Sequence, residues 1–142
     1  METSAVRRRV QAAITEARTR DQERRQRATD ATRDYAVFLE TVATPLMQQI
    51  ANVLKVEKYA FTVSTPGDTV QLSYDHGRDD FIELALDTSG ERPQVVGRVS
   101  RSRGSRRIDD ERPITANASP AELTEDDVLE FVMQALGPWL GR

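Results

Sequence analysis

The widest apolar pattern in the chain runs from Tyr35 to Leu54. Its main stripe steps by four, three, four, four and three residues, through Tyr35, Leu39, Val42, Leu46, Ile50 and Val53. This spacing places the stripe on one face of an α-helix, which is widened by Phe38, Ala43, Met47, Ala51 and Leu54. A face this wide is typical of a helix that covers a core. Because the apolar phase passes Pro45 unchanged, we expect either one kinked helix or two abutting helices.

The residues before this stripe predict a long polar helix, over residues 4–33. This segment has no Gly or Pro and is rich in Ala, Arg, Glu and Gln, which are good helix formers. Its apolar stripe is thin and ends early, with Val6, Val10, Ala13, Ile14 and Ala17. We therefore predict an extended, partly protruding helix; disorder up to residue 28 is the alternative. Residues 1–34 would be this polar, Arg-rich extension, and residues 35–142 a single domain.

After Leu54 the apolar period changes from that of a helix to that of a strand. Residues 59–64 alternate apolar with polar or small side chains, and the same alternation recurs in residues 70–74, 81–87 and 94–100. Glycine-containing turns separate these segments. Four short strands joined by tight turns predict an antiparallel β-meander. Its apolar face needs a cover, and the helix ending at Leu54 is the candidate.

The segment that follows, residues 101–113, is too polar to be a core strand. We expect a mobile loop here. The alternative is that Gly104-Ser105 turns the chain back, so that Arg106–Asp110 extends the sheet at its edge.

A second strong helix pattern begins at Thr124. Thr124 is a typical N-cap, and the next three residues are acidic, which suits the positive end of a helix dipole. The apolar face that follows consists of Val128, Leu129, Phe131, Val132, Ala135 and Leu136. Gly137-Pro138 ends this helix, and we expect Trp139 to tuck the C-terminus against the fold. The predicted class is α+β: a long N-terminal helix, a four-stranded antiparallel meander, and a C-terminal helix packed with the first helix on the sheet.

Length and composition limit the chemistry. A chain of 142 residues can bury a single core, and the absence of Cys excludes disulfides, thiolate nucleophiles and Cys-ligated metals. No apolar run approaches the ~20 residues of a membrane-spanning helix, and the N-terminus lacks the apolar core of a signal peptide. Glycine-rich phosphate-binding motifs are also missing. We therefore expect a cytoplasmic protein that binds no cofactor and contacts no membrane.

The net charge of -3 hides an uneven distribution of charge. Residues 1–34 contain nine Arg and six acidic residues, and residues 98–112 contain six Arg and three acidic residues. The closely spaced arginines in a Gly/Ser context are the sharpest functional signal, and they are Arg98, Arg101, Arg103, Arg106 and Arg107. Such a group suits the phosphate backbone of a nucleic acid, and Arg7, Arg8 and Arg9 suggest the same.

Other features oppose this interpretation. An acidic run follows the arginines at once, and no aromatic side chain lies among them on which a base could stack. We therefore favour a solvated loop that pairs with the protein's own acidic helix. Nucleic-acid binding through residues 98–107 and the N-terminal arginines stays the alternative.

The only histidine, His76, has Asp75, Asp79 and Asp80 beside it. Such a cluster could bind a divalent metal or act in acid-base chemistry, which gives a second alternative, a small-ligand or metal-dependent enzyme. Its place on a hairpin turn favours ordinary turn chemistry instead. We predict no catalytic, cofactor-binding or metal-binding residues.

The thin N-terminal stripe carries the functional expectation. A helix that cannot bury Val6, Val10, Ile14 and Ala17 on its own domain can bury them on a second copy, in a homodimer. The alternative is an arm that folds back on the sheet; the stripe is too short for a coiled coil. We expect a non-enzymatic interaction or adaptor protein. It would self-associate through its helices and present a sheet face or the Arg-rich loop to a protein partner whose identity the sequence does not reveal.

Overall fold

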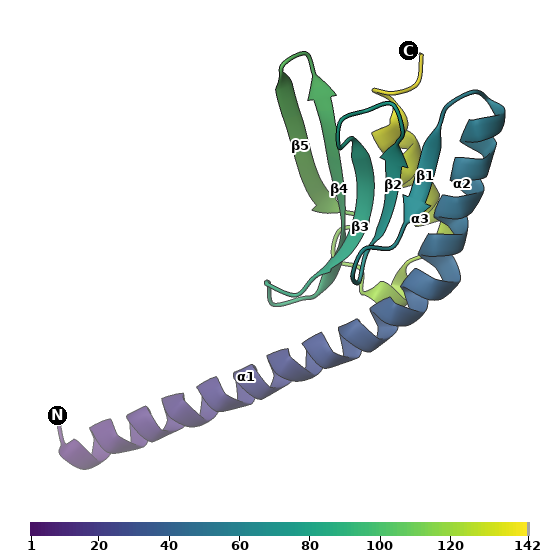
Figure 1. Cartoon of the computed structure of the whole chain (residues 1–142). Coiled ribbons are helices and arrows are strands. Elements are labelled where there is room, and N and C mark those ends of the chain that lie inside the picture. The colour runs from purple at the N-terminus through teal and green to yellow at the C-terminus, as the bar shows by residue number, and fades with distance from the viewer. Residues whose placement is uncertain (142) are drawn as a thin grey trace.

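The computed structural model describes residues 1–141 and has an α+β fold (Figure 1). Within these residues a long helical segment precedes five antiparallel strands and a C-terminal helix, which confirms the predicted class. The helical elements are α1 (Thr3–Phe38), η1 (Leu39–Ala43), α2 (Thr44–Val56), η2 (Pro120–Glu122) and α3 (Glu125–Leu136). The strands are β1 (Phe61–Ser64), β2 (Val70–Tyr74), β3 (Phe81–Asp87), β4 (Gln94–Arg103) and β5 (Arg106–Pro113). None of the described helices has the length and apolar character that a membrane span requires.

The helical segment bends where α1 meets α2 (Figure 1). There η1 forms one π-helical turn, and Pro45 follows in the first turn of α2. In an unbroken α-helix the Pro45 ring would clash with the carbonyl of Thr41, and Pro45 has no N–H to donate. The wider π turn relieves this conflict while the helix continues. One kinked helical rod therefore forms, and residues 3–28 are helical within it.

The π turn also changes which residues of α2 face the core, compared with the prediction. We expected Val53 on the core side, but it is 58% exposed, while Met47, Ile50 and Leu54 are buried. A π turn holds more residues than an α turn, so every later position lags by about one residue of rotation. The prediction assumed an unbroken helical phase through Pro45, and that assumption was wrong.

The sheet has the strand order β1-β2-β3-β4-β5, each strand antiparallel to the next. The meander topology is as predicted, but the described sheet has five strands where we expected four. Strand β4 continues to Arg103, and β5 returns along it in place of the expected loop. The polarity of this segment misled the prediction because β5 is an edge strand, whose side chains stay largely in solvent.

Local chemistry explains why the edge hairpin forms. Gly104 has a φ of +64°, which primed two-residue turns require at their first position. Across the strands, Arg98 pairs with Glu111 at 2.9 Å, and the Ser100 hydroxyl donates to Asp109 at 2.5 Å. Complementary pairs directly opposite one another hold the register of β5.

One face of the sheet is apolar and packs against α2 and α3. We call it the inner face and the opposite one the outer face. The buried cluster includes Met47, Ile50 and Leu54 of α2, Leu72, Ile82, Leu84 and Val95 of the sheet, and Val128, Phe131, Val132 and Leu136 of α3. The α3 helix approaches the sheet closely because β4 offers Gly97 to the Phe131 ring.

The C-terminal segment forms as predicted. Thr124 caps α3: its hydroxyl accepts the Asp127 N–H at 3.3 Å, and its own N–H donates to the Asp127 carboxylate at 2.9 Å. Beyond the helix, Trp139 is fully buried and packs edge-on against Phe61 of β1. These contacts fix the end of the described chain to the core.

Replacing Gly97 with Ala tests the packing of α3. A Cβ at this position would overlap the Phe131 ring, so α3 must shift, and we expect a loss of about 1–3 kcal/mol of stability. Thermal unfolding followed by circular dichroism measures the change. Gly90→Ala is the matched control, because its Cβ would meet only a backbone oxygen at 4.0 Å. Equal Tm values for the two variants would contradict this packing.

Candidate functional site

The five arginines that stand out in the sequence lie on the β4–β5 hairpin, which sorts them by face. Side chains alternate between the faces of a strand. The register sets Arg103 opposite Arg106 and Ser102 opposite Arg107. The inner face therefore carries Arg101, Arg103 and Arg106, and the outer face carries Arg98 and Arg107.

The two outer-face arginines are bound within the fold. Arg98 forms ion pairs with Glu83 of β3 at 3.2 Å and with Glu111 of β5 at 2.9 Å. The hydrogen bond from Arg98 to Glu111 raises the pKa of Arg98, and the bond to Glu83 acts in the same direction. Arg98 thus joins three strands on the outer face, and its charge is already compensated.

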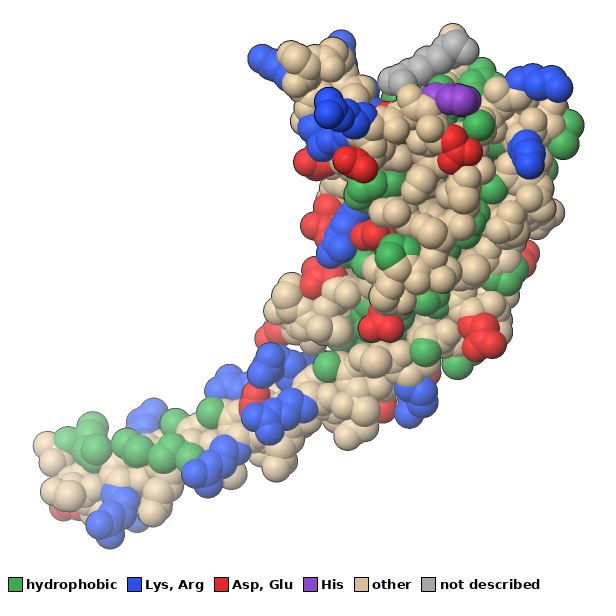
Figure 2. All heavy atoms as spheres, viewed as in Figure 1, with side chains coloured by type: hydrophobic (Ala, Val, Ile, Leu, Met, Phe, Trp, Pro, Cys, Tyr) green, Lys and Arg blue, Asp and Glu red, His purple; other side chains and the backbone are tan. Residues whose placement is uncertain are grey.

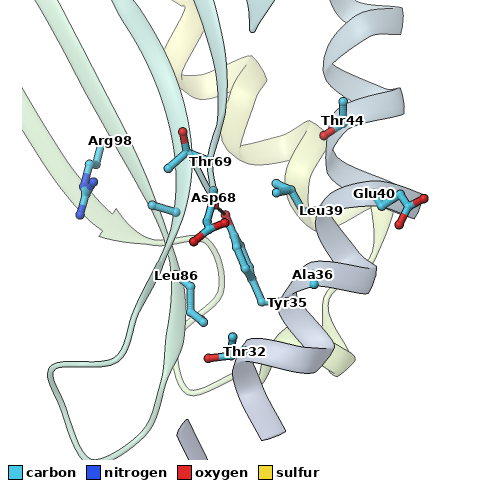
Figure 3. Close-up of a pocket in the computed structure, with 11 residues that line it drawn as sticks. Thr32, Tyr35, Ala36, Leu39, Glu40, Thr44, Asp68, Thr69, Leu86 and Arg98 are labelled. Carbon is cyan, nitrogen blue, oxygen red and sulfur yellow. Dashed lines mark hydrogen bonds between the residues drawn. The ribbon is translucent and has the colours of Figure 1, made fainter. Parts of the chain in front are cut away.

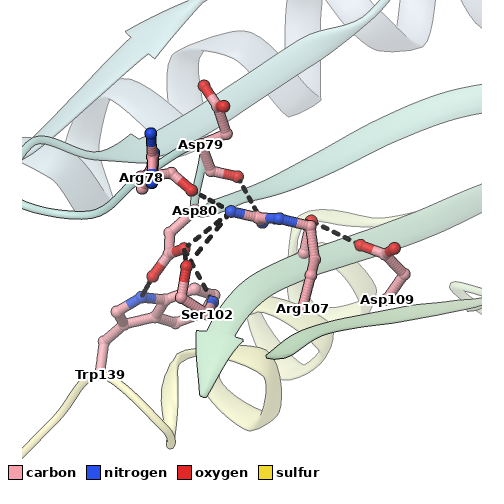
Figure 4. A network of polar contacts seen from close by, with 8 residues as sticks. Arg78, Asp79, Asp80, Ser102, Arg107, Asp109 and Trp139 are labelled. Atoms are coloured by element: carbon pink, nitrogen blue, oxygen red, sulfur yellow. Dashed lines mark hydrogen bonds and ion pairs between the residues drawn. The ribbon is translucent and has the colours of Figure 1, made fainter. Parts of the chain in front are cut away.

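Arg107 belongs to a second network, centred on the Asp80 carboxylate (Figure 4). Asp80 is 2% exposed and accepts hydrogen bonds from the Trp139 indole at 3.1 Å and the Ser102 N–H at 2.9 Å. Arg107 lies 3.7 Å from the same carboxylate and also donates to the Arg78 and Asp79 carbonyls. A buried charge needs such partners, so Asp80 and Arg107 have a structural role.

The remaining members of the predicted histidine cluster do not converge with Asp80. The Asp75 carboxylate accepts a hydrogen bond from Thr62 at 2.8 Å, and His76 packs edge-on against Tyr74. Asp79 occupies a turn with a φ of +57°. Among residues 1–141, no group of three or more His, Cys, Asp or Glu side chains is arranged to hold a metal ion.

The three inner-face arginines have no such partners. Within the described chain, no ion pair or side-chain hydrogen bond engages Arg101, Arg103 or Arg106. Arg103 and Arg106 are exposed and directly opposite one another, an arrangement of like charges that destabilises a strand pair. The hairpin tip is therefore a compact group of uncompensated positive charge, at the end of the sheet away from the arm of α1 (Figure 1).

At the other end, α1 projects away from the sheet. Figure 2 shows it as a narrow arm with basic side chains along its length and apolar ones near its tip. We define the arm as residues 3–26, because Arg27 is the first described residue of α1 with a hydrogen bond to the rest of the chain, 3.2 Å to the Glu91 carbonyl. Within the arm, Val6 is 45%, Val10 51% and Ile14 45% exposed.

The exposed stripe of the arm continues the face by which α1 packs on the domain. At about 100° of rotation per residue, Val6, Val10 and Ala17 fall within about 20° of the direction of Tyr35. Tyr35 and the nearby Ala31 are buried against the domain. One side of α1 is thus apolar at both ends, and only its C-terminal part is covered. The fold-back alternative does not occur, since the arm leaves the domain (Figure 1).

A cavity of about 590 Å³ lies where α1 and η1 meet the ends of β2 and β3 (Figure 3). Its walls are mostly apolar, with Ala36, Leu39 and Leu86, and hydroxyl groups from Thr32, Tyr35 and Thr69 line it. Sequence reasoning placed Tyr35 only in the apolar stripe. Residues from α1, η1 and the sheet line this cavity, so its position depends on tertiary packing that no sequence motif marks.

Tyr35 is the most perturbed group in the cavity. Its hydroxyl donates to the Asp68 carbonyl at 2.5 Å. Burial raises the pKa of Tyr35 to about 12, and the negative charges of Asp68 and Glu83 act in the same direction. The phenol therefore remains neutral and anchors α1 to the start of β2. Because its proton is held by a backbone carbonyl, the geometry favours a structural role.

The ionisation of Tyr35 gives a test. Its neutral form is favoured in the folded state, so its contribution to stability is complete below pH 10 and declines as the pH rises toward 12. Absorbance titration at alkaline pH should show a late tyrosine step, toward pH 12. Tyr35→Phe should remove this late step. A late step that persists in Tyr35→Phe would contradict the assignment.

We compared the chain with models of known protein families, with characterised proteins and with solved structures, and found no match.

Proposed function

We propose that this protein is a non-enzymatic interaction module that self-associates through the arm of α1 and presents its sheet end to a protein partner. The observation that carries this proposal is the exposure of Val6, Val10 and Ile14 on a helix that continues well beyond the domain. Self-association supplies the cover that the chain itself does not provide.

Helix energetics support a partner for the arm. An isolated helix is only marginally stable in water. In proteins, most of the stability of a helix comes from the packing of its apolar face. Within the arm, the described ion pairs are those of Asp21 with Arg24 and Arg25. Surface pairs of this kind contribute only a few tenths of a kcal/mol each. A long arm with an apolar stripe is therefore better explained as one half of an interface.

The other half of the proposal concerns the sheet end. On the outer face, hydrogen bonds and ion pairs join Gln71, Glu83, Arg98 and Glu111 across four strands, which leaves that face polar and internally compensated. The hairpin tip, by contrast, projects with three uncompensated arginines. An acidic segment of a partner protein would complement it, and we place the adaptor surface there.

Substitution within the stripe tests self-association. Val10→Asp places a charge in the proposed interface and should convert a dimer into a monomer, as measured by light scattering coupled to size exclusion. Because the stripe is short, the dimer should be weak, and concentrations from about 1 to 200 µM should be covered. Ala12→Asp is the matched control on the opposite side of the arm, and it should leave the dimer intact.

Two outcomes would contradict this proposal. One is a monomeric mass at every concentration, and the other is an equal loss of dimer in the two variants.

A second candidate function, nucleic-acid binding, is favoured by the hairpin tip. Arg101, Arg103 and Arg106 share one face, and the like-charge pair Arg103–Arg106 costs stability unless an anion lies beside it. A phosphate backbone would relieve this repulsion and would bind with little sequence preference. The N-terminal arginines Arg7, Arg8 and Arg9 could add contacts at the other end.

Titration with single- and double-stranded DNA and RNA tests this candidate. Replacing Arg101, Arg103 and Arg106 with Gln should weaken binding at least tenfold. The wild-type association constant should fall with roughly the first power of the salt concentration for each phosphate that the protein neutralises. The equal-charge control replaces Arg18, Arg20 and Arg92 with Gln. Absence of binding at low salt, or an equally large effect of both triple variants, would count against a hairpin site.

A further inference from the structure

We propose that the partner of the arm is a second copy of this chain, and that the two arms pair antiparallel with Val6 of each copy level with Ala17 of the other. This register rests on the proposed self-association and specifies its geometry. Its central contact is between Val10 and Ala13 of the two copies.

The spacing of the stripe supports a two-fold antiparallel arrangement. Four residues of the stripe, Val6, Val10, Ala13 and Ala17, are separated by steps of four, three and four, which read the same in both directions, and Ile14, 45% exposed, flanks this seam on one side. A two-fold axis pairs a surface with its own reverse, so a stripe of this kind is complementary to itself. The axis passes between positions 11 and 12, where the steps are centred.

Side-chain size favours the same register. When Val6 meets Ala17 and Val10 meets Ala13, each larger side chain lies opposite a smaller one, so the helices can approach closely and evenly. In a parallel pair, each of these residues would instead contact the same residue of the second chain. The valines would hold the helices apart at one end, and the alanines would leave gaps at the other.

Charge gives an independent reason. Arg9 and Glu16 lie on the same flank of the stripe, and antiparallel pairing brings Arg9 of each copy near Glu16 of the other, twice per dimer. Neither residue takes part in an ion pair or side-chain hydrogen bond within residues 1–141. Arg20 lies at the edge of the stripe. In a parallel pair it would face Arg20 of the second chain, a contact between like charges, whereas the antiparallel register places it opposite Thr3.

The arm is long enough for this pairing. The register uses residues 3–20 of each copy, a helix of about 27 Å at 1.5 Å per residue. All of these residues precede Arg27, the first with a hydrogen bond to the domain. The domains therefore lie beyond the two ends of the paired region and do not obstruct it.

Disulfide trapping in the full-length chain tests the register. The native sequence contains no Cys, so only introduced thiols can react. Val6→Cys and Ala17→Cys chains, mixed and oxidised, should form a covalent dimer. Either variant alone should remain monomeric on a non-reducing gel, because like positions would be about 16 Å apart along the axis, beyond the reach of a disulfide. Ala12→Cys, on the opposite side of the arm, measures random collision.

The outcomes separate the register from self-association itself. Cross-linking of Val6→Cys alone would overturn the antiparallel register and indicate a parallel pair. A dimer by light scattering with no cross-link above the Ala12→Cys level would overturn it in favour of another surface. A chain that stays monomeric by light scattering would instead remove the proposed self-association.

A charge exchange gives a second test of the same register. Glu16→Arg should weaken the dimer about threefold to tenfold, because Arg9 of each copy would then lie near an arginine of the other copy and be repelled by it. Adding Arg9→Glu to this variant should restore the wild-type dissociation constant, measured by sedimentation. A double variant as weak as the single one would contradict the contact between Arg9 and Glu16.

Discussion

The continuity of the helical rod through the bend at Pro45 is the constraint on which the rest of the structure depends. After the bend, Met47, Ile50 and Leu54 fix α2 to the sheet. Before it, Tyr35 fixes α1 by its hydrogen bond to the Asp68 carbonyl. With both sides of the bend held, the direction of α1 is set, and a stiff helix cannot turn back within the arm. The arm therefore projects away from the domain. Because the domain does not reach it, its apolar stripe stays exposed.

A second constraint acts at the hairpin end. The Asp80 carboxylate is buried and needs positive and N–H partners, which Arg107, Ser102 and Trp139 supply. One carboxylate thereby ties the start of β3 to β4, β5 and the C-terminal segment. Because Arg107 is used for this purpose, the tip keeps Arg101, Arg103 and Arg106 as its uncompensated charges. The fold itself thus divides the arginines into those that hold the hairpin and those that can bind something else.

Sequence patterns predicted what depends on local periodicity and missed what depends on neighbours. The helix after Thr124 was clear because its cap and apolar face are both local, and the first four strands alternate in a regular way. The fifth strand was missed because an edge strand buries little, and its stability comes from partners such as Arg98 opposite Glu111, which are distant in sequence. The exposure of Val53 was missed because a π turn leaves no sequence signal that distinguishes it from an α turn. Asp80 stood out for its chemistry, but only its burial reveals a structural role.

The proposed antiparallel pair would connect the two ends of the molecule. In it, the domains lie at opposite ends of the paired arms, with the two Arg27 residues about 45 Å apart along the axis. Each domain carries its hairpin tip on the side away from its own arm (Figure 1). A dimer would then present two basic tips on one rigid support. A partner with two matching acidic or anionic sites could engage both, and the second contact would form at the high effective concentration set by the first. A weak site at each tip is therefore sufficient for useful affinity in the dimer.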